Sequence, residues 1–321
     1  MTTFRDDVMN GLSSKQKELP SKWIYNDVGD DLFLQVTKMP EYYLTASEKE
    51  IFQDQCQAMI TSFKRETLTR NVDVIELGAG DGEKSILLLQ NLLKQNNEHN
   101  IFKYIPIDIS RHSLDILATK FKKEVPSISI YPEEGDYITA LKNIRRTTND
   151  WSTRNRIILF LGNSIGNMDG ENAKTFISQL ENFLLAGDLL VLGVDLIKPD
   201  TIILPAYSGP RNLRFKLNML KRINDELGGN FDLCKFSNES TYTQQEGILR
   251  DYIKSAERQE VYIKDIDTAF QIEKDETIQI DISCKYDDER MCELINNERL
   301  PYVCKFTDTR NYFADYIYRV I

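Results

Sequence analysis

The fold of this chain is decided by residues 72–84, which read VDVIELGAGDGEK. An apolar run carries an acidic residue, Glu76, near its end, glycines follow at alternate positions, and a leucine-rich stretch begins directly behind them. This order predicts a buried strand, a glycine loop and a helix. Such a unit brings bare backbone against a ligand at the carboxyl end of a parallel sheet. The stretch therefore indicates a nucleotide-like cofactor.

The spacing of the glycines distinguishes two classes of cofactor. A dinucleotide fingerprint reads G-x-G-x-x-G and places a pyrophosphate at a helix N-terminus. Here Gly78, Gly80 and Gly82 alternate. The carboxylate of Glu76 would repel a pyrophosphate but suits a cationic ligand. The pattern E-x-G-x-G-x-G resembles the first motif of S-adenosylmethionine (SAM) methyltransferases, whose cofactor carries a sulfonium and an ammonium. A glycine-rich turn without any ligand is the alternative when the loop is taken alone.

Length and composition narrow the class of protein. The 321 residues suffice for one large α/β domain or two smaller ones. Lys and Arg total 40 against 50 Asp and Glu, a net charge of −10, which disfavours nucleic acid or an anionic membrane as partner. We find neither a membrane-spanning apolar stretch nor a signal peptide. The five scattered cysteines predict reduced thiols in a cytoplasmic protein without a metal site, and no obligate protein partner is evident.

Strand and helix patterns alternate over the first two thirds of the chain. The pattern predicts a helix over 45–67, begun by a capping box of Ser47 and Glu50, and a helix over 170–186 between Asp169 and Gly187. Short apolar runs predict strands at 72–77, 101–107, 127–131, 156–161 and 188–194. This alternation is typical of a doubly wound parallel sheet in an α/β protein.

The alternation of strand and helix patterns ends at about residue 196. Residues 197–270 are polar, and we expect them to be irregular apart from one helix near 211–227 that stops at Gly228–Gly229. We interpret this region as an inserted or appended substrate domain. Strands are expected again at 277–286, 302–307 and 312–320. A terminal antiparallel pair that completes a parallel sheet is also typical of SAM methyltransferases.

Acidic side chains follow the second and third predicted strands, where α/β sheets bind their ligands. Asp108 can accept hydrogen bonds from both ribose hydroxyls, and its alternative role is to cap the helix that follows. Asp136 can accept from an adenine amino group while Tyr137 covers the ring. The fourth strand leads into residues 161–167, LGNSIGN, a small polar loop that we expect between cofactor and substrate.

Short segments spread over nearly the whole chain share their pattern with a known family. They are residues 19–27, 29–33, 39–45, 76–80, 84, 107–110, 135–137, 160–162, 164–167, 187–188, 206–207 and 281–286. In these segments the chain resembles the histidine-specific SAM-dependent methyltransferases, the Nα-methyltransferases of ergothioneine biosynthesis. The resemblance implies a Rossmann-like class I SAM methyltransferase sheet with a second, substrate-binding α+β domain. The implied SAM-binding domain comprises residues 53–196 and 286–321, and the implied substrate-binding domain comprises residues 1–52 and 197–285.

The resemblance also implies site residues. In the substrate site, the residues implied to bind the substrate carboxylate are Asn167 and Tyr207. The residue implied near the reacting amine is Tyr25, which we expect to be catalytic. The residues implied to face the imidazole are Tyr42, Asp281 and Ser283. In the cofactor site, the implied residues are Phe33, Glu76, Gly78, Gly80, Lys84, Asp108, Asp136 and Tyr137. The strand pattern supports part of this set, since isoleucines alternate with polar residues at 278–284 and place Asp281 and Ser283 on one face. A solvent-facing strand edge is the alternative for that pattern.

Four residues depart from the family pattern. Asp281 stands where the histidine enzymes have Glu, and its side chain is shorter by roughly 1.5 Å. Asn163 replaces a glycine, and Phe33 often corresponds to a tyrosine in the family. The stretch 248–253 matches the family pattern poorly, and an acidic Asp251 there would change the pocket lining. The shorter Asp281 leaves room for a water-mediated contact or for a bulkier ring, so these residues bear on the choice of substrate.

The resemblance implies methylation of the α-amino group of L-histidine, up to the trimethylated betaine hercynine. Within the same class, the alternative is another aromatic or imidazole amino acid or amine, such as tryptophan or a modified histidine. Two other classes are a SAM- or amino-acid-binding protein without turnover and a nicotinamide oxidoreductase. The intact glycine loop, with Asp108 and Asn167, argues against the first of these, and the glycine spacing with Glu76 argues against the second.

Overall fold

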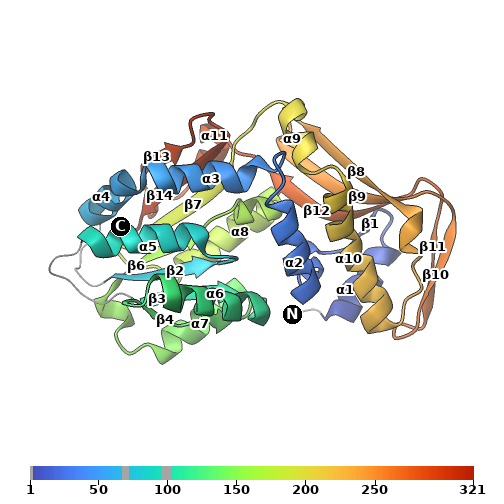
Figure 1. Cartoon of the computed structure of the whole chain (residues 1–321), viewed down its shortest axis with the longest axis horizontal. Coiled ribbons are helices and arrows are strands. Elements are labelled where there is room, and N and C mark those ends of the chain that lie inside the picture. The colour runs from blue at the N-terminus through green and yellow to red at the C-terminus, as the bar shows by residue number, and fades with distance from the viewer. Residues whose placement is uncertain (1–2, 67–71, 96–102) are drawn as a thin grey trace. The chain divides into compact units, whose positions relative to one another are not determined.

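A computed structural model describes residues 3–66, 72–95 and 103–321 of the chain (Figure 1). It divides into two compact units, each built from two stretches of sequence. The first unit contains the residues up to Tyr43 and Lys198–Ser283. The second unit contains Leu44–Ile197 and Cys284–Ile321.

The second unit is built on an eight-stranded sheet. Its strands are β2 (Val72–Leu77), β3 (Lys103–Asp108), β4 (Ser129–Ile130), β5 (Glu133–Glu134), β6 (Asn155–Phe160), β7 (Leu189–Asp195), β13 (Tyr302–Thr307) and β14 (Phe313–Arg319). They are ordered β13-β14-β7-β6-β2-β3-β4, with β5 also beside β3. The central strands pair in parallel, whereas β14 runs antiparallel to both β7 and β13. This confirms the predicted parallel sheet and its terminal antiparallel pair.

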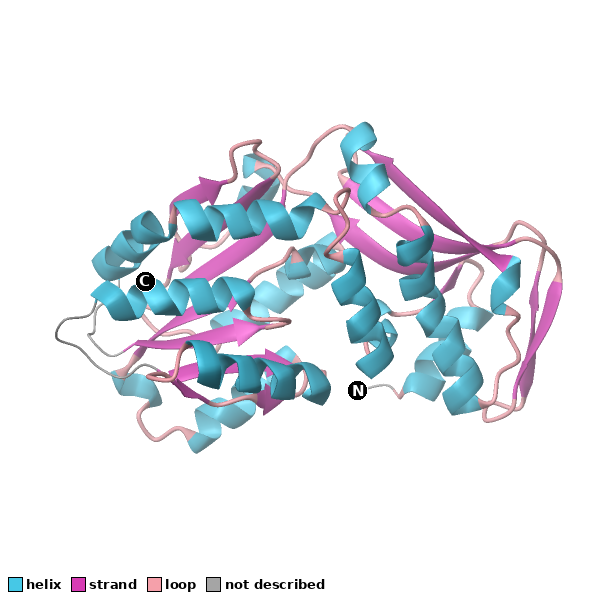
Figure 2. Ribbon diagram, in the orientation of Figure 1, coloured by secondary structure: helices cyan, strands magenta, loops and turns pink. Residues whose placement is uncertain are grey.

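Helices connect and cover these strands (Figure 2). They are α3 (Tyr43–Asp54), α4 (Cys56–Glu66), α5 (Glu83–Gln95), α6 (Arg111–Glu124), α7 (Tyr137–Thr147), α8 (Gly170–Glu181) and α11 (Asp288–Leu294). Every residue of β6 and β7 is buried, as expected for strands covered on both faces. The α/β class predicted from the alternation is thus confirmed.

Several predicted boundaries in this unit are wrong. The helix predicted over 45–67 is interrupted at Gln55, whose side chain donates to the carbonyl of Thr307. Ser47 does not cap it, because α3 already begins at Tyr43 and Ser47 lies buried inside the helix, accepting from Arg310. The helix α8 ends at Glu181, six residues before Gly187. Gly187 instead takes a left-handed turn (φ +85°) into β7. Residue 67 and residues 101–102 of the predicted elements lie outside the described residues.

The first unit combines helices with two smaller sheets. Its elements are α1 (Phe4–Ser13), β1 (Lys17–Glu18), η1 (Ser21–Ile24), α2 (Asp27–Val36), α9 (Asp200–Ala206), α10 (Pro210–Leu227), η4 (Leu233–Lys235), β8 (Phe236–Thr243), β9 (Ile248–Ser255), β10 (Gln259–Ile263), β11 (Thr268–Ile272) and β12 (Thr277–Cys284). One sheet is ordered β1-β12-β9-β8, and β10 pairs with β11. The predicted helix near 211–227 is confirmed as α10, which ends at Gly228 in the left-handed conformation.

The expectation of an irregular stretch at 197–270 is wrong, because four strands lie there. Burial alternates strictly along β9 and β10, which is the pattern of strands with one covered face. Two of the buried positions in β9 are polar, Asp251 and Ser255. Their polarity conceals the alternation in the sequence, because buried charge is not counted as part of an apolar face.

The first boundary between the units lies close to the start of α3. The predicted domain boundary after residue 52 falls inside that helix, whereas the two units separate between Tyr43 and Leu44. They separate again at Ile197/Lys198 and at Ser283/Cys284.

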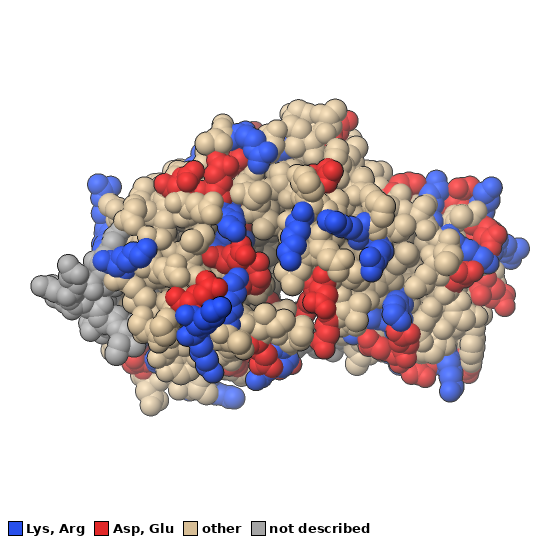
Figure 3. Space-filling view, viewed as in Figure 1, with Lys and Arg blue, Asp and Glu red and all other residues tan. Residues whose placement is uncertain are grey.

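Among the described residues, no helix combines the length and the apolar character that crossing a bilayer would require. On the face shown in Figure 3, Lys and Arg side chains are interspersed with Asp and Glu side chains. Basic side chains on that face are thus mixed with acidic ones rather than gathered in a patch of one sign.

Candidate active site

The glycine loop between β2 and α5 depends on glycine at more than one position. Gly78 (φ +75°) and Gly82 (φ +65°) both adopt the left-handed conformation. An added Cβ on Gly82 would lie 2.1 Å from Cδ1 of Leu117 on α6, so a larger residue there would be strained by the backbone and would displace the Leu117 side chain. Gly80 (φ +52°) instead has no atom within 4 Å of its Cβ position. The loop thus packs tightly at Gly82 and leaves open space over Gly80.

Asp108 lies at the end of β3 and contacts this loop. Its Oδ2 accepts from the Gly80 amide at 3.4 Å, and its Oδ1 accepts from the Ser110 amide at 3.0 Å. The residue that caps α6 is Ser110, whose hydroxyl accepts from the Ser113 amide. The alternative role of Asp108 as the helix cap is therefore wrong, and its carboxylate lies beside the loop.

Asp136 has an unsatisfied oxygen. Its Oδ1 caps α7 by accepting from the Thr139 amide at 3.0 Å, whereas its Oδ2 is buried and has no hydrogen-bond partner. The hydroxyl of the next residue, Tyr137, lies 2.9 Å from the Cβ position of Gly78. A buried acceptor without a donor is costly unless a ligand supplies one. The free Oδ2 and the open space over Gly80 therefore fit an adenosyl group with its exocyclic amine.

Glu76 is buried rather than placed at the open mouth of the loop. It is 2% exposed, and its Oε2 accepts from the hydroxyls of Ser85 and Tyr104. Burial raises the pKa of its carboxyl to about 7, against the opposing effect of these two hydrogen bonds. The side chain thus ties β2 to β3 and α5, and its contact with a cationic ligand stays a prediction.

A buried cluster that the sequence analysis missed surrounds Lys84. The Nζ of Lys84 pairs with Glu48 of α3, and the Glu48 carboxylate also accepts from the Gly162 amide at 2.8 Å. Asp315 of β14 completes the cluster, and burial together with the Glu48 charge raises its pKa well above the usual range. The two carboxylates can approach β7 this closely because residue 193 is glycine. A Cβ at Gly193 would lie 2.2 Å from Glu48 Oε1 and 3.0 Å from Asp315 Oδ1. Burial alone would lower the pKa of Lys84, but Glu48 and the other nearby carboxylates reverse the shift.

The predicted ligand Asn167 ends a short turn, η3 (Ser164–Asn167), that follows β6. Asn167 is exposed, whereas Asn163, which precedes the turn, is buried in the left-handed conformation (φ 60°). The Asn163 side chain accepts from the Asp195 amide at 2.9 Å and donates to the Cys284 carbonyl at 3.3 Å. The residue that departs from the family glycine therefore ties the loop to β7 and to the end of β12.

Replacing Asn163 with glycine should test this structural role. The left-handed backbone favours glycine, but the change leaves the buried Asp195 amide without its acceptor. We expect a net loss of about 1–2 kcal/mol in the free energy of unfolding, with the substrate preference unchanged. Chemical denaturation would measure the free energy of unfolding, and a competition assay between histidine and tryptophan would measure the substrate preference. A changed preference at unchanged stability would contradict the structural role of Asn163.

The first unit brings most of the predicted aromatic residues into one cluster. Tyr25 packs edge-on against Phe33 and Phe215, with ring centroids 5.8 and 5.6 Å apart. Phe33 lies 6.2 Å from Tyr42, which in turn lies 6.1 Å from Tyr207. Phe215 of α10 was missed in the sequence, where an apolar residue at helical spacing predicts only core. Within this unit Phe33 belongs to the cluster of predicted substrate residues, and its assignment to the cofactor stays a prediction.

Polar groups adjoin this cluster through Tyr207. The Tyr207 hydroxyl and Ser283 Oγ lie 3.0 Å apart, so the structure brings together two predicted substrate residues from α9 and β12. On the same strand, Asp281 has a buried Oδ1 without a hydrogen-bond partner. Burial, and then the neighbouring Asp251 carboxylate, raise the pKa of Asp281 to about 7. This carboxyl can therefore donate as well as accept near neutral pH.

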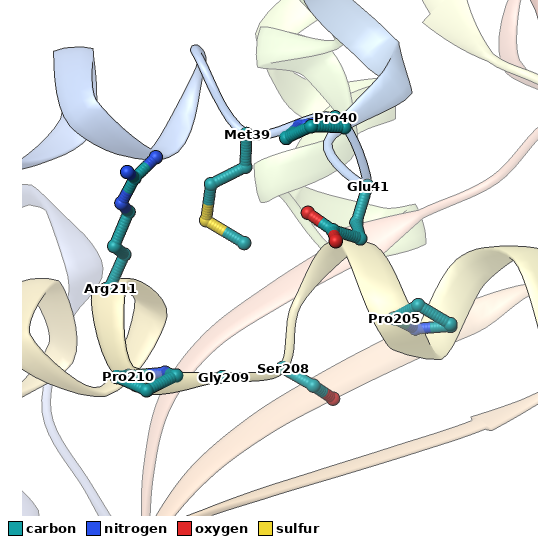
Figure 4. Close-up of a pocket in the computed structure, with 8 residues that line it drawn as sticks. All are labelled: Met39, Pro40, Glu41, Pro205, Ser208, Gly209, Pro210 and Arg211. Carbon is teal, nitrogen blue, oxygen red and sulfur yellow. The ribbon is translucent and has the colours of Figure 1, made fainter.

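A surface pocket of about 570 Å³ lies within the first unit (Figure 4). It is lined by Met39, Pro40, Glu41, Pro205, Ser208, Gly209, Pro210 and Arg211. The two sides of the pocket come from the turn before Tyr42 and from the turn that follows α9, which contains Tyr207. Asn212 links the two sides, because its amide donates to the Ser208 carbonyl at 2.7 Å and contacts the Met39 sulfur at 3.8 Å.

Comparison with known proteins identifies the relatives of this chain. The model of the family described as "Histidine-specific methyltransferase, SAM-dependent" matches residues 4–320. A histidine N-alpha-methyltransferase of Mycobacterium tuberculosis is 31% identical over 285 residues, covering 88% of this chain and 84% of that protein. Its counterpart of Mycolicibacterium smegmatis is 30% identical and covers 90% of this chain and 86% of its own length. The N-methyltransferase fsqC of Aspergillus fumigatus is 30% identical over 72% of this chain and 60% of its own length.

Proposed function

This chain belongs to the histidine-specific, SAM-dependent methyltransferase family, and we propose on that premise that it methylates the α-amino group of L-histidine. The observation that carries the choice of substrate is the polar group in the first unit. Tyr207 and Ser283 share a hydrogen bond, and Asp281 offers an unsatisfied buried oxygen on the same strand. An imidazole has one donor and one acceptor nitrogen, so it can satisfy both a carboxyl and a hydroxyl.

Residues of the second unit would hold the cofactor. Asp108 would accept from the ribose hydroxyls, Asp136 would accept from the adenine amine, and the loop from Gly78 to Gly82 would lie against the nucleoside. Lys84 is paired with Glu48 in the structure, so its contact with the cofactor stays a proposal. When bound, SAM supplies an activated methyl group on a sulfonium. The protein therefore has to contribute orientation and a deprotonated amine rather than further activation.

The first unit would bind the amino acid and lower the pKa of its amine. Tyr207 would bind the carboxylate, and Asn167 of the second unit stays a proposed second donor to it. The rings around Tyr25, among them Phe33 and Phe215, make a weakly polar environment for the ammonium. Loss of water there disfavours the charged form, so the amine gives up its proton more readily. We assign no general base, because desolvation and bulk buffer suffice for this proton transfer.

The Tyr25 hydroxyl would orient the amine between successive methyl transfers on the way to the trimethylated betaine hercynine. Replacing Tyr25 with phenylalanine keeps the ring contacts to Phe33 and Phe215 but removes the hydroxyl. We expect the proportion of mono- and dimethylated products to change several-fold at equal turnover. Mass spectrometry of the product mixture at several times would measure it. An unaltered distribution would show that the hydroxyl takes no part.

The direct experiment is mass spectrometry of the purified protein incubated with SAM and a panel of free amino acids and amines, histidine included. Conversion of histidine to a methylated product would support the proposal. Methylation of another member, such as tryptophan or a modified histidine, with histidine untouched, would contradict the choice of substrate and keep the enzyme class. The second outcome would direct attention to Asp281 and Asp251, which depart from the family pattern.

A reducing compartment, such as the cytoplasm, is the location we propose for this enzyme. All five cysteines are free thiols, and Cys56 and Cys284 are buried. Burial raises the pKa of Cys56 to about 11, which keeps it as an unreactive thiol at neutral pH.

A further inference from the structure

Asn218 is a buried polar side chain in the middle of α10 that the proposed mechanism does not use. The residue is only 3% exposed. Asparagine is a weaker helix former than an apolar residue such as leucine, and burying its amide costs free energy unless the amide is hydrogen-bonded. An apolar side chain would fill this position of the helix at lower cost. The choice of asparagine therefore indicates a role besides packing.

The Asn218 amide joins the two elements on either side of Tyr25. Its Nδ2 donates to the Ile24 carbonyl of η1 at 2.8 Å and to Asn26 Oδ1 at 2.9 Å. Asn26 is the N-cap of α2, and the same oxygen accepts from the Gly29 amide at 2.9 Å. Tyr25 lies between these two anchored residues, so its main chain is held on both sides.

The first turn of α2 depends on glycine for this arrangement. Both α2 and η1 pack against α10 (Figure 1). An added Cβ on Gly29 would lie 2.0 Å from the Ile24 carbonyl oxygen and 3.0 Å from Asn218 Nδ2. Because the closer contact is with a main-chain oxygen, a larger residue would displace the carbonyl that Asn218 binds. The three elements thus fix one position for the chain at Tyr25.

The same helix contacts the Tyr25 segment at two further positions, about one turn to either side of Asn218. Phe215 packs against the Tyr25 ring, with the centroids 5.6 Å apart. Arg222 donates through Nη1 to the Trp23 carbonyl at 2.7 Å and to the Tyr25 carbonyl at 3.4 Å. Residues three and four apart lie on one face of a helix, so a single face of α10 holds both the ring and the main chain of Tyr25.

The other buried polar side chains of α10 also bind main-chain carbonyls. Asn212 donates to the carbonyls of Ala206 and Ser208. Lys216 donates to the carbonyl of Tyr207 at 3.2 Å. Every buried polar residue of this helix thus binds a carbonyl of, or next to, a tyrosine that we propose for the substrate site. The helix therefore supports the segments from which these tyrosines project.

We propose that Asn218 is a positioning residue, which acts through Tyr25 and controls how far methylation proceeds. The inference rests on the proposed function, in which the Tyr25 hydroxyl orients the amine between successive methyl transfers. Such orientation depends on geometry, and a displacement of about 1 Å is enough to change a reaction rate strongly. Loss of the Asn218 amide would release the main chain at Ile24 and Asn26, and the hydroxyl would move with it.

The test is mass spectrometry of the products that Asn218→Ala forms from histidine and SAM, with Asn224→Ala as the matched control. Asn224 lies on the same helix, and its side chain donates to the Phe231 carbonyl and accepts from the Phe231 amide, each at 2.8 Å. Either change thus removes two hydrogen bonds made by α10. We expect Asn218→Ala to shift the proportion of mono- and dimethylated products several-fold, in the direction in which Tyr25→Phe shifts it. Asn224→Ala should keep the wild-type proportion.

A double variant, Asn218→Ala with Tyr25→Phe, separates positioning from a general structural role. If Asn218 acts through the Tyr25 hydroxyl, the double variant gives the product distribution of Tyr25→Phe alone. A general loss of packing would instead add to the effect of Tyr25→Phe. If Asn218→Ala fails to fold, Arg222→Met replaces it, because this change removes the donor to the carbonyls of Trp23 and Tyr25 at a less buried position. It should shift the products in the same direction.

Hydrogen exchange reports on the position of the segment without any turnover. The amides of Gly29 and Asp30 both bond to Asn26, and they should exchange several-fold faster in Asn218→Ala than in Asn224→Ala. Unchanged exchange at these amides would overturn the inference whichever amine the enzyme methylates.

Three product distributions would also overturn it: the wild-type distribution in folded Asn218→Ala, the same shift in Asn224→Ala, or additive effects in the double variant. Failure of the proposed function is read separately, from the inability of wild type to methylate histidine. If wild type methylates another amine, the same comparison of products is made with that amine.

Discussion

Asp108→Ala should weaken the binding of SAM by about 100-fold or more. Each hydrogen bond from a ribose hydroxyl to a carboxylate contributes about 1.5–3 kcal/mol, and every 1.4 kcal/mol is a tenfold change in affinity. The variant also loses the contact from Asp108 to the Gly80 amide, which positions the glycine loop. Titration calorimetry with S-adenosylhomocysteine would measure the change.

Asp115→Ala is the matched control for this prediction. Asp115 lies on α6, the helix that follows β3 and Asp108, and pairs with Arg111 at 3.0 Å on the exposed surface. Exposed pairs of this kind contribute at most about 1 kcal/mol, and we expect no change in cofactor affinity. If the Asp108→Ala protein folds and its affinity for the cofactor is within about threefold of wild type, Asp108 does not contact the cofactor.

Asp281→Ala should lower kcat/KM for histidine by about 100-fold or more and, at the same time, stabilise the protein above neutral pH. The loss of activity follows because a buried ring nitrogen loses its partner, and sites built around such hydrogen bonds discriminate strongly. Steady-state kinetics would measure it, with the exposed Asp225→Ala as control. Unchanged kinetics for histidine would exclude Asp281 from the substrate site.

The sign of the stability change follows from the raised pKa of Asp281. Its pKa is about 7 in the fold and about 4 in the unfolded chain, so between these values the folded state binds more protons. The contribution of this carboxyl to stability therefore falls as pH rises from about 4 to about 7. Asp281→Ala should gain about 1–2 kcal/mol relative to wild type at pH 8, allowing for partial exposure, and little at pH 4. Denaturant unfolding at the two pH values would check this; a gain that is larger at pH 4 would contradict it.

Short sequence patterns were sufficient to predict those features that depend on neighbouring residues in the chain. The glycine spacing at 78–82 predicted the cofactor loop, because a left-handed backbone at all three positions favours residues without a side chain. The alternation at 278–284 placed Asp281 and Ser283 on one face of β12, because side chains alternate along any strand. The alternation of strand and helix patterns along the chain predicted the parallel sheet, because a helix normally connects two parallel strands.

The predictions were wrong where distant partners decide the structure. Ser47 and Glu50 match a capping box, but α3 begins earlier and Ser47 accepts from Arg310, which is 263 residues away in the chain. Strand β9 escaped notice because Asp251 and Ser255 occupy buried positions that apolar residues normally fill. Asp251 is tolerated there because Lys216 of α10 neutralises it and the Ser240 hydroxyl donates to it.

The sequence by itself determined the SAM-type loop and the α/β class, since these depend on residue spacing within single strands, turns and helices. It also indicated the family, through the resemblance of short segments spread over the chain. Only the tertiary structure decided which polar groups share a buried environment. It brought Glu48 to Lys84 and Asp315 in one unit, and Lys216 to Asp251 beside Asp281 in the other. The physical reason is that charge and hydrogen-bond energies depend on distance and burial in space. Neither quantity can be obtained from positions along the chain.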